Sequence, residues 1–296
     1  MRLPALRPSM SRPRAAVPSA RPDWKRRLDE IRANRSEGAG PLAQATLAVL
    51  ARELRRPALA SPATTRSFAT EVTRELARTQ PAMAVFGEWS RDWRGMRRTT
   101  SGNLLGRVLR RWVRRWNDRI RAEPARIGRV VARRMPPKAR VLTLSHSSTV
   151  ARAFLSLPAS RRPREVIALE SRPGGEGRSL VRELRRGGLP ARWVPDRAMP
   201  RVVAAADLVV LGADTVEANG DLVHKVGTRA LVAEAWRMGV PVVVIAGRSK
   251  WRTGPAAPGR LPRRFDRTPA RGISEYWTDL GVRRPAGRAA RASQRR

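Results

Sequence analysis

Residues 207–247, DLVVLGADTVEANGDLVHKVGTRALVAEAWRMGVPVVVIAG, decide the fold of this chain. They contain two almost uninterrupted apolar runs, DLVVLGA (207–213) and VPVVVIAG (240–247), with a helical pattern at 227–239 between them. Buried parallel strands read as near-continuous runs of Val, Ile and Leu. Two such strands with a helix between them form one unit of a parallel sheet that carries helices on its faces.

The same alternation continues toward the N-terminus. Three more apolar runs, VLTLS, EVIALE and ARWVP, are expected strands, at 141–145, 165–170 and 191–195, and helical patterns follow them at 147–156, 176–187 and 198–205. We therefore expect an α/β fold in which a doubly wound, Rossmann-like parallel sheet domain spans residues 136–251, beginning at Pro136 and Pro137.

Residues 23–135 carry apolar residues at helical spacing and predict a helical domain. The expected helices are 23–33, 41–56, 65–79 and 81–95, then a basic stretch at 97–134 in which Pro124 begins a further helix to Met135. Two segments lie outside both domains. Residues 1–22 predict a disordered basic tail, and residues 252–296 predict an Arg- and Pro-rich C-terminal tail with one helix-like piece near 273–280.

The composition limits the class of protein. Among 296 residues, 62 Lys and Arg exceed 24 Asp and Glu, which gives a net charge of +38, and there is no Cys. Without Cys there is no disulfide framework, thiolate metal site, iron–sulfur cluster or cysteine nucleophile. No apolar run approaches the roughly 20 residues of a membrane span. We expect a soluble cytoplasmic protein with no membrane contact, no metal and no cofactor.

Positive charge is densest in residues 97–134, which hold 13 Arg against Asp118 and Glu123. Apolar residues recur there at helical spacing, so one stripe of the helix is expected to be packed. The arginines on its other faces allow three interpretations: a solvated basic face, a surface for RNA or another polyanion, or a contact with an acidic partner helix.

Polar side chains cluster where the expected strands end. In a doubly wound sheet, ligands bind outside the carboxyl ends of the strands. The candidate residues are Ser145, His146, Ser147 and Ser148 after the first strand, Arg172 and Arg178 after the second, Asp214, His224 and Lys225 after the fourth, and Lys250 after the fifth. A helix N-terminus and basic side chains both favour a phosphate. A partly buried Asp214 suits proton transfer, although a helix cap or an Asx turn also explains it.

At these residues the chain resembles a known family. GADTVEANGDLVHKVGT with VPVVVIAGRSKW, ESRPGGEGRSLVRELRRGGL and VLTLSHSST are similar to a domain shared by two groups of proteins. One group is the alpha, beta and delta subunits of translation initiation factor 2B. The other is the aldose–ketose isomerases that act on methylthioribose 1-phosphate or ribose 1,5-bisphosphate. The resemblance is strong over about 140–251 and weaker over 22–139, where IRANRSEGAGPLA carries it.

The resemblance also implies roles for single residues. The family's isomerases use a Cys after the first strand and an Asp after the fourth, which fall here on Ser145 and Asp214. Their Arg before a Gly-Ala pair is Glu37 here, followed by Gly38. Their Asn-Lys pair reads His224-Lys225, and a Lys after the fifth strand matches Lys250. Because a Ser hydroxyl is a far poorer acid than a thiol, either histidine is a candidate substitute for the missing thiol.

Three functions follow. The favoured one is an initiation factor 2B-like protein that binds a phosphorylated small molecule, a sugar phosphate or a nucleotide, without turning it over. The second is an aldose–ketose isomerase with Asp214 as acid and base, assisted by His146 or His224. The third is a nucleic-acid-binding protein that acts through its arginine-rich helices. The resemblance further implies a homodimer or a larger assembly.

Overall fold

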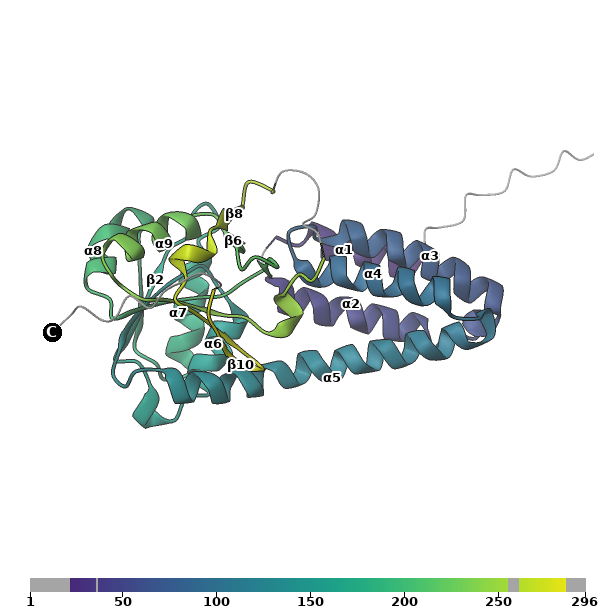
Figure 1. Cartoon of the computed structure of the whole chain (residues 1–296), viewed down its shortest axis with the longest axis horizontal. Helices are drawn as coiled ribbons and strands as arrows, with labels where there is room; N and C mark the ends of the chain where they lie inside the picture. Colours follow the sequence, from purple (N-terminus) through teal and green to yellow (C-terminus); the bar gives the residue numbers. More distant parts are fainter. Residues whose placement is uncertain (1–21, 36, 255–260, 286–296) are drawn as a thin grey trace, which may run out of the picture.

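The computed structural model describes residues 22–35, 37–254 and 261–285. Figure 1 shows two halves side by side, a bundle of helices and a sheet flanked by helices, with the long helix α5 running beneath both. This confirms the expected α/β architecture, a helical domain followed by a mostly parallel sheet. The predicted disordered tail, apart from Pro22, lies outside the described residues.

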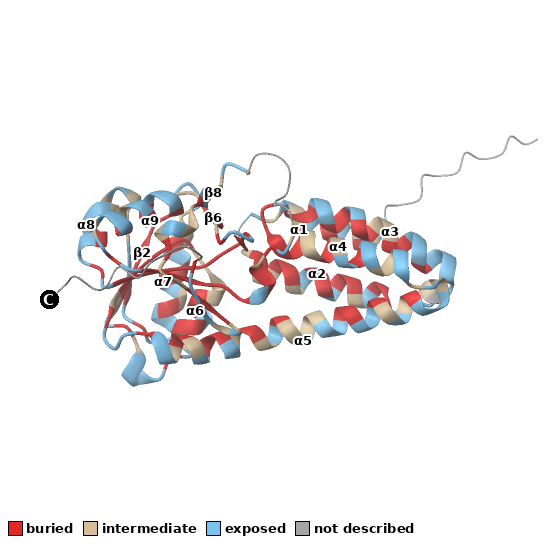
Figure 2. Cartoon of the chain, viewed as in Figure 1, coloured by how far each residue is buried: buried red, intermediate tan, exposed pale blue. Residues whose placement is uncertain are grey.

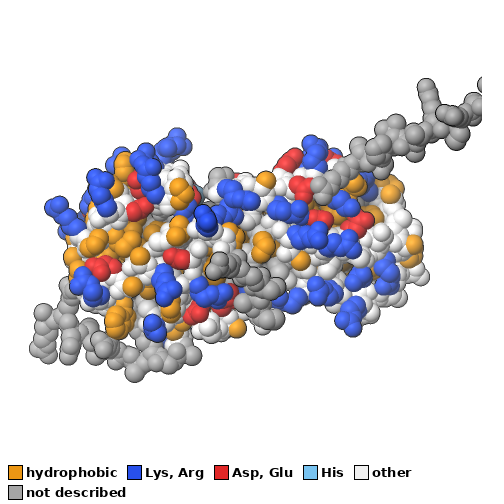
Figure 3. All heavy atoms as spheres, turned by 90° about the horizontal axis from the view of Figure 1, so that it is seen from above, with side chains coloured by type: hydrophobic (Ala, Val, Ile, Leu, Met, Phe, Trp, Pro, Cys, Tyr) orange, Lys and Arg blue, Asp and Glu red, His pale blue; other side chains and the backbone are white. Residues whose placement is uncertain are grey.

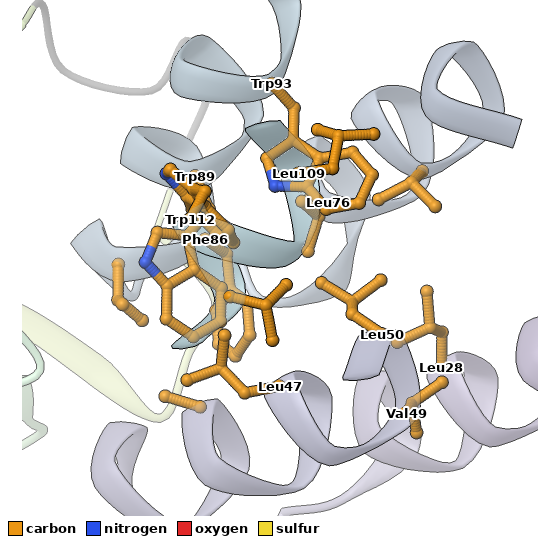
Figure 4. Close-up of a cluster of buried hydrophobic side chains, with 14 of the residues drawn as sticks. Leu28, Leu47, Val49, Leu50, Leu76, Phe86, Trp89, Trp93, Leu109 and Trp112 are labelled. Atoms are coloured by element: carbon orange, nitrogen blue, oxygen red, sulfur yellow. The ribbon is translucent and has the colours of Figure 1, made fainter. Parts of the chain in front are cut away.

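The helical half forms because each of its helices has one apolar face. It consists of α1 (Asp23–Ala33), α2 (Ala39–Glu53), α3 (Pro62–Thr79), α4 (Ala84–Thr99) and the first part of α5 (Gly102–Arg134), with a short 3₁₀ turn, η1 (Pro57–Ala60), before α3. At the centre of the bundle, the Trp89 ring lies edge-on to the rings of Phe86, Trp112 and Trp116 at centroid distances of 5.4–5.8 Å. Figure 4 shows three of these rings together with the leucines of α1 and α2.

Helix α5 corrects one expectation, because Pro124 does not begin a new helix. The helix runs without a break through Pro124. Proline has no N–H and usually interrupts a helix. Here packing on both sides of it holds the helix together, since Ile120 is buried in the core of the bundle and Ile127 in the core beside the sheet. One helix therefore joins the two halves, and most of its arginines lie on its solvent face.

The central sheet has seven strands in the order β10-β9-β7-β4-β1-β2-β3. Five of them match the expected strands: β1 (Arg140–Leu144), β2 (Glu165–Leu169), β3 (Ala191–Val194), β4 (Leu208–Leu211) and β7 (Val242–Ile245). These five pair in parallel. The connecting segments are α6 (Ser148–Leu155), η2 (Ala159–Arg161), α7 (Glu176–Arg186), η3 (Asp196–Ala198), α8 (Met199–Ala204), α9 (Thr228–Arg237) and η4 (Arg248–Lys250).

Two strands among the described residues after Trp251 extend the central sheet, which corrects a second expectation. The helix-like piece near 273–280 is strand β9 (Glu275–Thr278), which pairs in parallel with β7 and antiparallel with β10 (Gly281–Arg283). Neighbouring apolar residues explain it. Tyr276 packs in the core on one face of the sheet and the next residue, Trp277, in the core on the other. That alternation belongs to a strand. The sheet therefore extends beyond the expected limit at residue 251.

A second, small sheet stands at the carboxyl end of β4. It is antiparallel and consists of β5 (Thr215–Val216), β6 (Leu222–Lys225) and β8 (Phe265–Thr268), which η5 (Ala270–Gly272) links to β9. The sequence suggests only polar loops here. The hairpin and the returning chain fold over the edge of the central sheet and build one wall of the site described next.

Burial follows from this layering. Figure 2 shows the central strands buried along their whole length, between helices on both faces, while each bundle helix has both buried and exposed residues. Among the described residues, no helix is both long enough and apolar enough to cross a membrane.

Candidate functional site

A pocket opens where the carboxyl ends of β1 and β4, the small sheet and the residues just before α2 meet. We call it the sheet-edge pocket; its space is about 580 Å³, including the part open to solvent. Nine of the sequence-predicted residues line it: Gly38, Ser145, His146, Ser147, Ser148, Asp214, His224, Lys225 and Lys250. Segments from opposite ends of the chain are thus brought to one place.

Arg172 and Arg178 lie outside this pocket. Both point to the carboxylate of Glu170 at the end of β2, Arg178 at 2.6 Å and Arg172 at 3.5 Å. The Arg178 guanidinium also lies 4.3 Å from the centre of the Trp193 ring. These two arginines neutralise a buried carboxylate, so the structure explains them without a ligand.

The chain turns sharply after β1. Ser145 adopts a left-handed backbone with φ of +67°, which is uncommon for a residue other than glycine. Ser147 caps α6 by accepting the Val150 N–H at 3.4 Å. Gly212 lies against this turn so closely that a Cβ there would sit 2.3 Å from the Ser147 hydroxyl oxygen. The turn therefore presents Ser145 to the pocket, where its hydroxyl has no hydrogen-bond partner among the described residues.

His146 contacts a carboxylate from a neighbouring helix. Its Nε2 lies 2.7 Å from the Glu183 carboxylate of α7. This contact orients the ring and occupies Nε2. Of the two histidines, His146 is therefore less available to a ligand.

His224 is held in one tautomer by a chain of hydrogen bonds. The Thr228 hydroxyl donates to the Lys225 carbonyl at 2.6 Å, so it accepts from His224 Nδ1 at 3.1 Å. Nδ1 then carries the proton, and Nε2 is left as an acceptor near Gly212. Burial lowers the pKa of the imidazole, against the opposing effect of Asp214, so His224 is neutral at neutral pH. A neutral imidazole with a free Nε2 is a competent base.

Asp214 and Lys250 are both buried on the floor of the pocket. The Lys250 ammonium donates to the Ala213 carbonyl at 2.8 Å. Burial lowers the pKa of Lys250, while Asp214 and Glu123 act in the opposite direction. The Asp214 carboxylate accepts no hydrogen bond from the described residues. An acidic group and a basic group therefore share the floor, and both retain capacity to bind a ligand.

Lys225 meets a carboxylate that the sequence arguments had not selected. Its ammonium is ion-paired with Glu176, the first residue of α7. The other carboxylate oxygen of Glu176 is buried without a partner. The sequence does contain a feature that could have identified Glu176, because this residue follows Gly174 and Gly175 at the start of a predicted helix.

Two further lining residues, Arg35 and Arg264, were also missed. Arg264 lies in the segment expected to be a tail, so only the tertiary structure brings it here. Glu37 lines the mouth of the pocket, where it is exposed and receives a hydrogen bond from the Asn34 side-chain amide at 3.3 Å. The pocket thus carries four lysine or arginine side chains: Arg35, Lys225, Lys250 and Arg264.

Known proteins have sequences related to this one. A sequence profile of the Initiation factor 2 subunit family matches residues 35–255. The chain is 32% identical over 144 residues to a ribose 1,5-bisphosphate isomerase of Archaeoglobus fulgidus, which is 49% of this chain and 46% of that protein. It is 34% identical over 222 residues to a methylthioribose-1-phosphate isomerase of Anaeromyxobacter dehalogenans, which is 60% of this chain and 64% of that protein. The chain thus spans about half to two thirds of these relatives.

Solved structures share the fold. Translation initiation factor eIF-2B of Pyrococcus horikoshii OT3 superposes with a TM-score of 0.78 at 22% identity, over 90% of this chain and 98% of that one. A chain of the tetrameric eIF2B-beta2-delta2 complex of C. thermophilum gives a TM-score of 0.73 at 20% identity, over 88% and 90%. At these identities the likeness establishes the fold alone.

Proposed function

The chain belongs to the initiation factor 2 subunit family, and we propose that it binds a phosphorylated small molecule in the sheet-edge pocket. The ligand class is a sugar phosphate or a nucleotide. Its phosphate lies against the basic side chains of the pocket, and its hydroxyls lie against Asp214 and His224. This matches the family's mixture of sugar-phosphate isomerases and initiation factor subunits.

The buried ammonium of Lys250 carries the proposal. Burying a charge is costly unless it is paired. The Lys250 ammonium donates its hydrogen bond to a neutral carbonyl, and Asp214 is nearby on the same floor. A basic group kept buried at the end of a parallel sheet, next to a carboxylate that accepts no hydrogen bond from the described residues, is better explained by an anionic ligand than by packing.

Aldose–ketose isomerisation is the second candidate, and the tautomer of His224 favours it. In that reaction one hydrogen moves from C2 to C1 of the sugar, O2 loses a proton, and the ring oxygen O4 gains one as the ring opens, while the phosphate stays on O1. Asp214 and the free Nε2 of His224 are two groups that can exchange those protons. We rank binding first because Ser145 stands where the family's isomerases carry a thiol.

We also propose that the chain assembles with itself. The tetrameric eIF2B-beta2-delta2 complex, whose chain shares this fold, supports this proposal. The half that contains the central sheet would supply the contact. The charge of +38 makes such an assembly dependent on counterions.

One experiment tests binding and turnover together. Ribose 1,5-bisphosphate, methylthioribose 1-phosphate and nucleotides are added to the protein, and the melting temperature and isomerised product are both measured. We expect a ligand at about 100 times its Kd to raise the melting temperature by roughly 5 °C. Asp214→Asn should weaken that shift. Arg178→Gln, which lies outside the pocket, is the matched control and should leave it unchanged.

The outcomes are distinct. If none of the phosphorylated compounds raises the melting temperature, the binding proposal is wrong. If product forms and Asp214→Asn abolishes it, the second candidate replaces the first.

A further inference from the structure

A second cavity adjoins the sheet-edge pocket and is lined mainly by arginines. It lies between the C-terminal ends of α1 and α3 and residues 262–264 before β8, and its space is about 720 Å³, including the part open to solvent. We propose that it is a binding site for a phosphate dianion, either free phosphate or the phosphate group of a small phosphomonoester. We call it the arginine pocket and define it by Arg35, Arg78, Arg263 and Arg264.

The four guanidinium groups have no carboxylate partner among the described residues. The Arg78 and Arg263 side chains form no hydrogen bond or ion pair with the described residues. Arg35 donates to the carbonyls of Arg32 and Asn34, and Arg264 donates to the Gln80 side chain. A fifth arginine in the cavity, Arg32, differs because it is ion-paired with Asp29 and Glu75. These two acids are thereby occupied, and no acid is among the described residues that line the arginine pocket.

Gln80 links the end of α1 to Arg264 of the arginine pocket. Its amide nitrogen donates to the carbonyls of Ile31, Arg32 and Asn34 at 3.1–3.2 Å. Carbonyls at a helix C-terminus repel anions. The buried amide covers these three and turns its oxygen to Arg264 at 2.7 Å. The end of α1 is therefore partly screened, and one guanidinium is held in a fixed orientation.

Among the described residues, these arginines have no carboxylate within ion-pair distance. Arg35 and Arg264 line both cavities, and burial followed by the charge of Arg35 lowers the pKa of Arg264, against the opposing effect of Asp214 and Glu176. Like charges held close together repel, and an anion bound between them offsets that repulsion. Figure 3 views the molecule from above and shows basic side chains predominating over acidic ones across both halves.

Phosphate suits this arrangement better than other small anions. Guanidinium groups donate two parallel hydrogen bonds to a tetrahedral oxyanion, and these bonds are strongest when the oxygens are fully ionised. The inference goes beyond the proposed function, because it concerns a separate cavity and uses Arg78 and Arg263, which do not line the sheet-edge pocket.

The test is phosphate binding by the full chain at constant ionic strength, with chloride as the replaced anion. Inorganic phosphate and ribose 5-phosphate are titrated separately by calorimetry. We expect Arg78→Gln/Arg263→Gln to weaken binding of the tighter of the two about tenfold or more, since charge-assisted hydrogen bonds are lost. The compound whose affinity falls more in this variant shows whether the site takes free phosphate or the phosphate group of a phosphomonoester.

A charge-matched control is essential in a chain of this charge. Arg182→Gln/Arg186→Gln removes the same number of charges from exposed positions of α7 that line neither cavity, and should leave the affinity within about twofold. The proposal is overturned if the pocket variant binds as the wild type does, or if the control weakens binding equally. Neither outcome depends on Asp214, so failure here is distinguishable from failure of the proposed function.

Discussion

The two halves of the molecule bury different things. The bundle buries rings and aliphatic side chains, with Trp89 and Trp93 fully enclosed. The sheet buries aliphatic side chains along its strands, but at its carboxyl edge it also buries Asp214, His224, Lys225 and Lys250. Apolar burial stabilises a fold, whereas buried ionisable groups cost free energy unless they are paired. The bundle's buried acids Glu53 and Glu75 are ion-paired with Arg56 and Arg32, whereas Asp214 at the sheet edge accepts no hydrogen bond from the described residues. The difference teaches that the bundle's core mainly stabilises the fold, while the carboxyl edge of the sheet retains buried polar groups for a ligand.

The boundary between the halves links them. The sheet contributes the buried polar floor of the site, and the bundle contributes its mouth through Arg35, Glu37 and Gly38. The bundle therefore acts on the site as a scaffold, and its own core should be indifferent to the ligand. Three changes test this division, from the largest expected effect to the smallest.

Trp89→Ala should destabilise the protein most, by about 3–5 kcal/mol, because it removes a fully buried ring and leaves a cavity among three aromatic neighbours. Denaturant unfolding measures the change. Ligand-induced stabilisation should persist at temperatures where the variant is folded. A loss below about 1 kcal/mol would mean that the bundle repacks and that its core is less specific than it looks.

His224 should make stability depend on pH. Its pKa is lowered by burial in the folded state, so the unfolded chain binds the proton more readily. Stability is then complete above the unfolded value of about 6.5 and falls as the pH drops below it. His224→Gln should flatten the loss of melting temperature between pH 7.5 and 5.5. An equally steep loss in the variant would place the titrating group elsewhere.

The outer arginines of α5 should affect stability least and polyanion binding most. Replacing Arg110, Arg111, Arg114 and Arg115 with Gln should change the unfolding free energy by no more than a few tenths of a kcal/mol per residue. If the helix contacts RNA, the slope of log Kd against log salt should become shallower by up to about four. An unchanged slope would leave this face as solvated surface.

Much of the fold could be predicted from local pattern. Near-continuous apolar runs marked β1, β2, β3, β4 and β7, and the resemblance to the family is confirmed by the family match over residues 35–255. Two expectations failed for a common reason. In both places, packing against distant residues overrides the local preference. Pro124 lies inside a helix that is packed into two cores, and the piece near 273–280 forms a strand that pairs with β7.

The sequence by itself determined the class of fold and most of the candidate residues, because hydrophobic period and residue type are local properties. Only the tertiary structure decided which candidates meet. It placed Arg172 and Arg178 on Glu170, His146 on Glu183, and Arg35 beside Arg264 from residues more than 200 positions away. The physical reason is that a side chain's partner depends on how strands are ordered and where segments return. Those contacts are non-local, and the pattern around one residue carries no information about them.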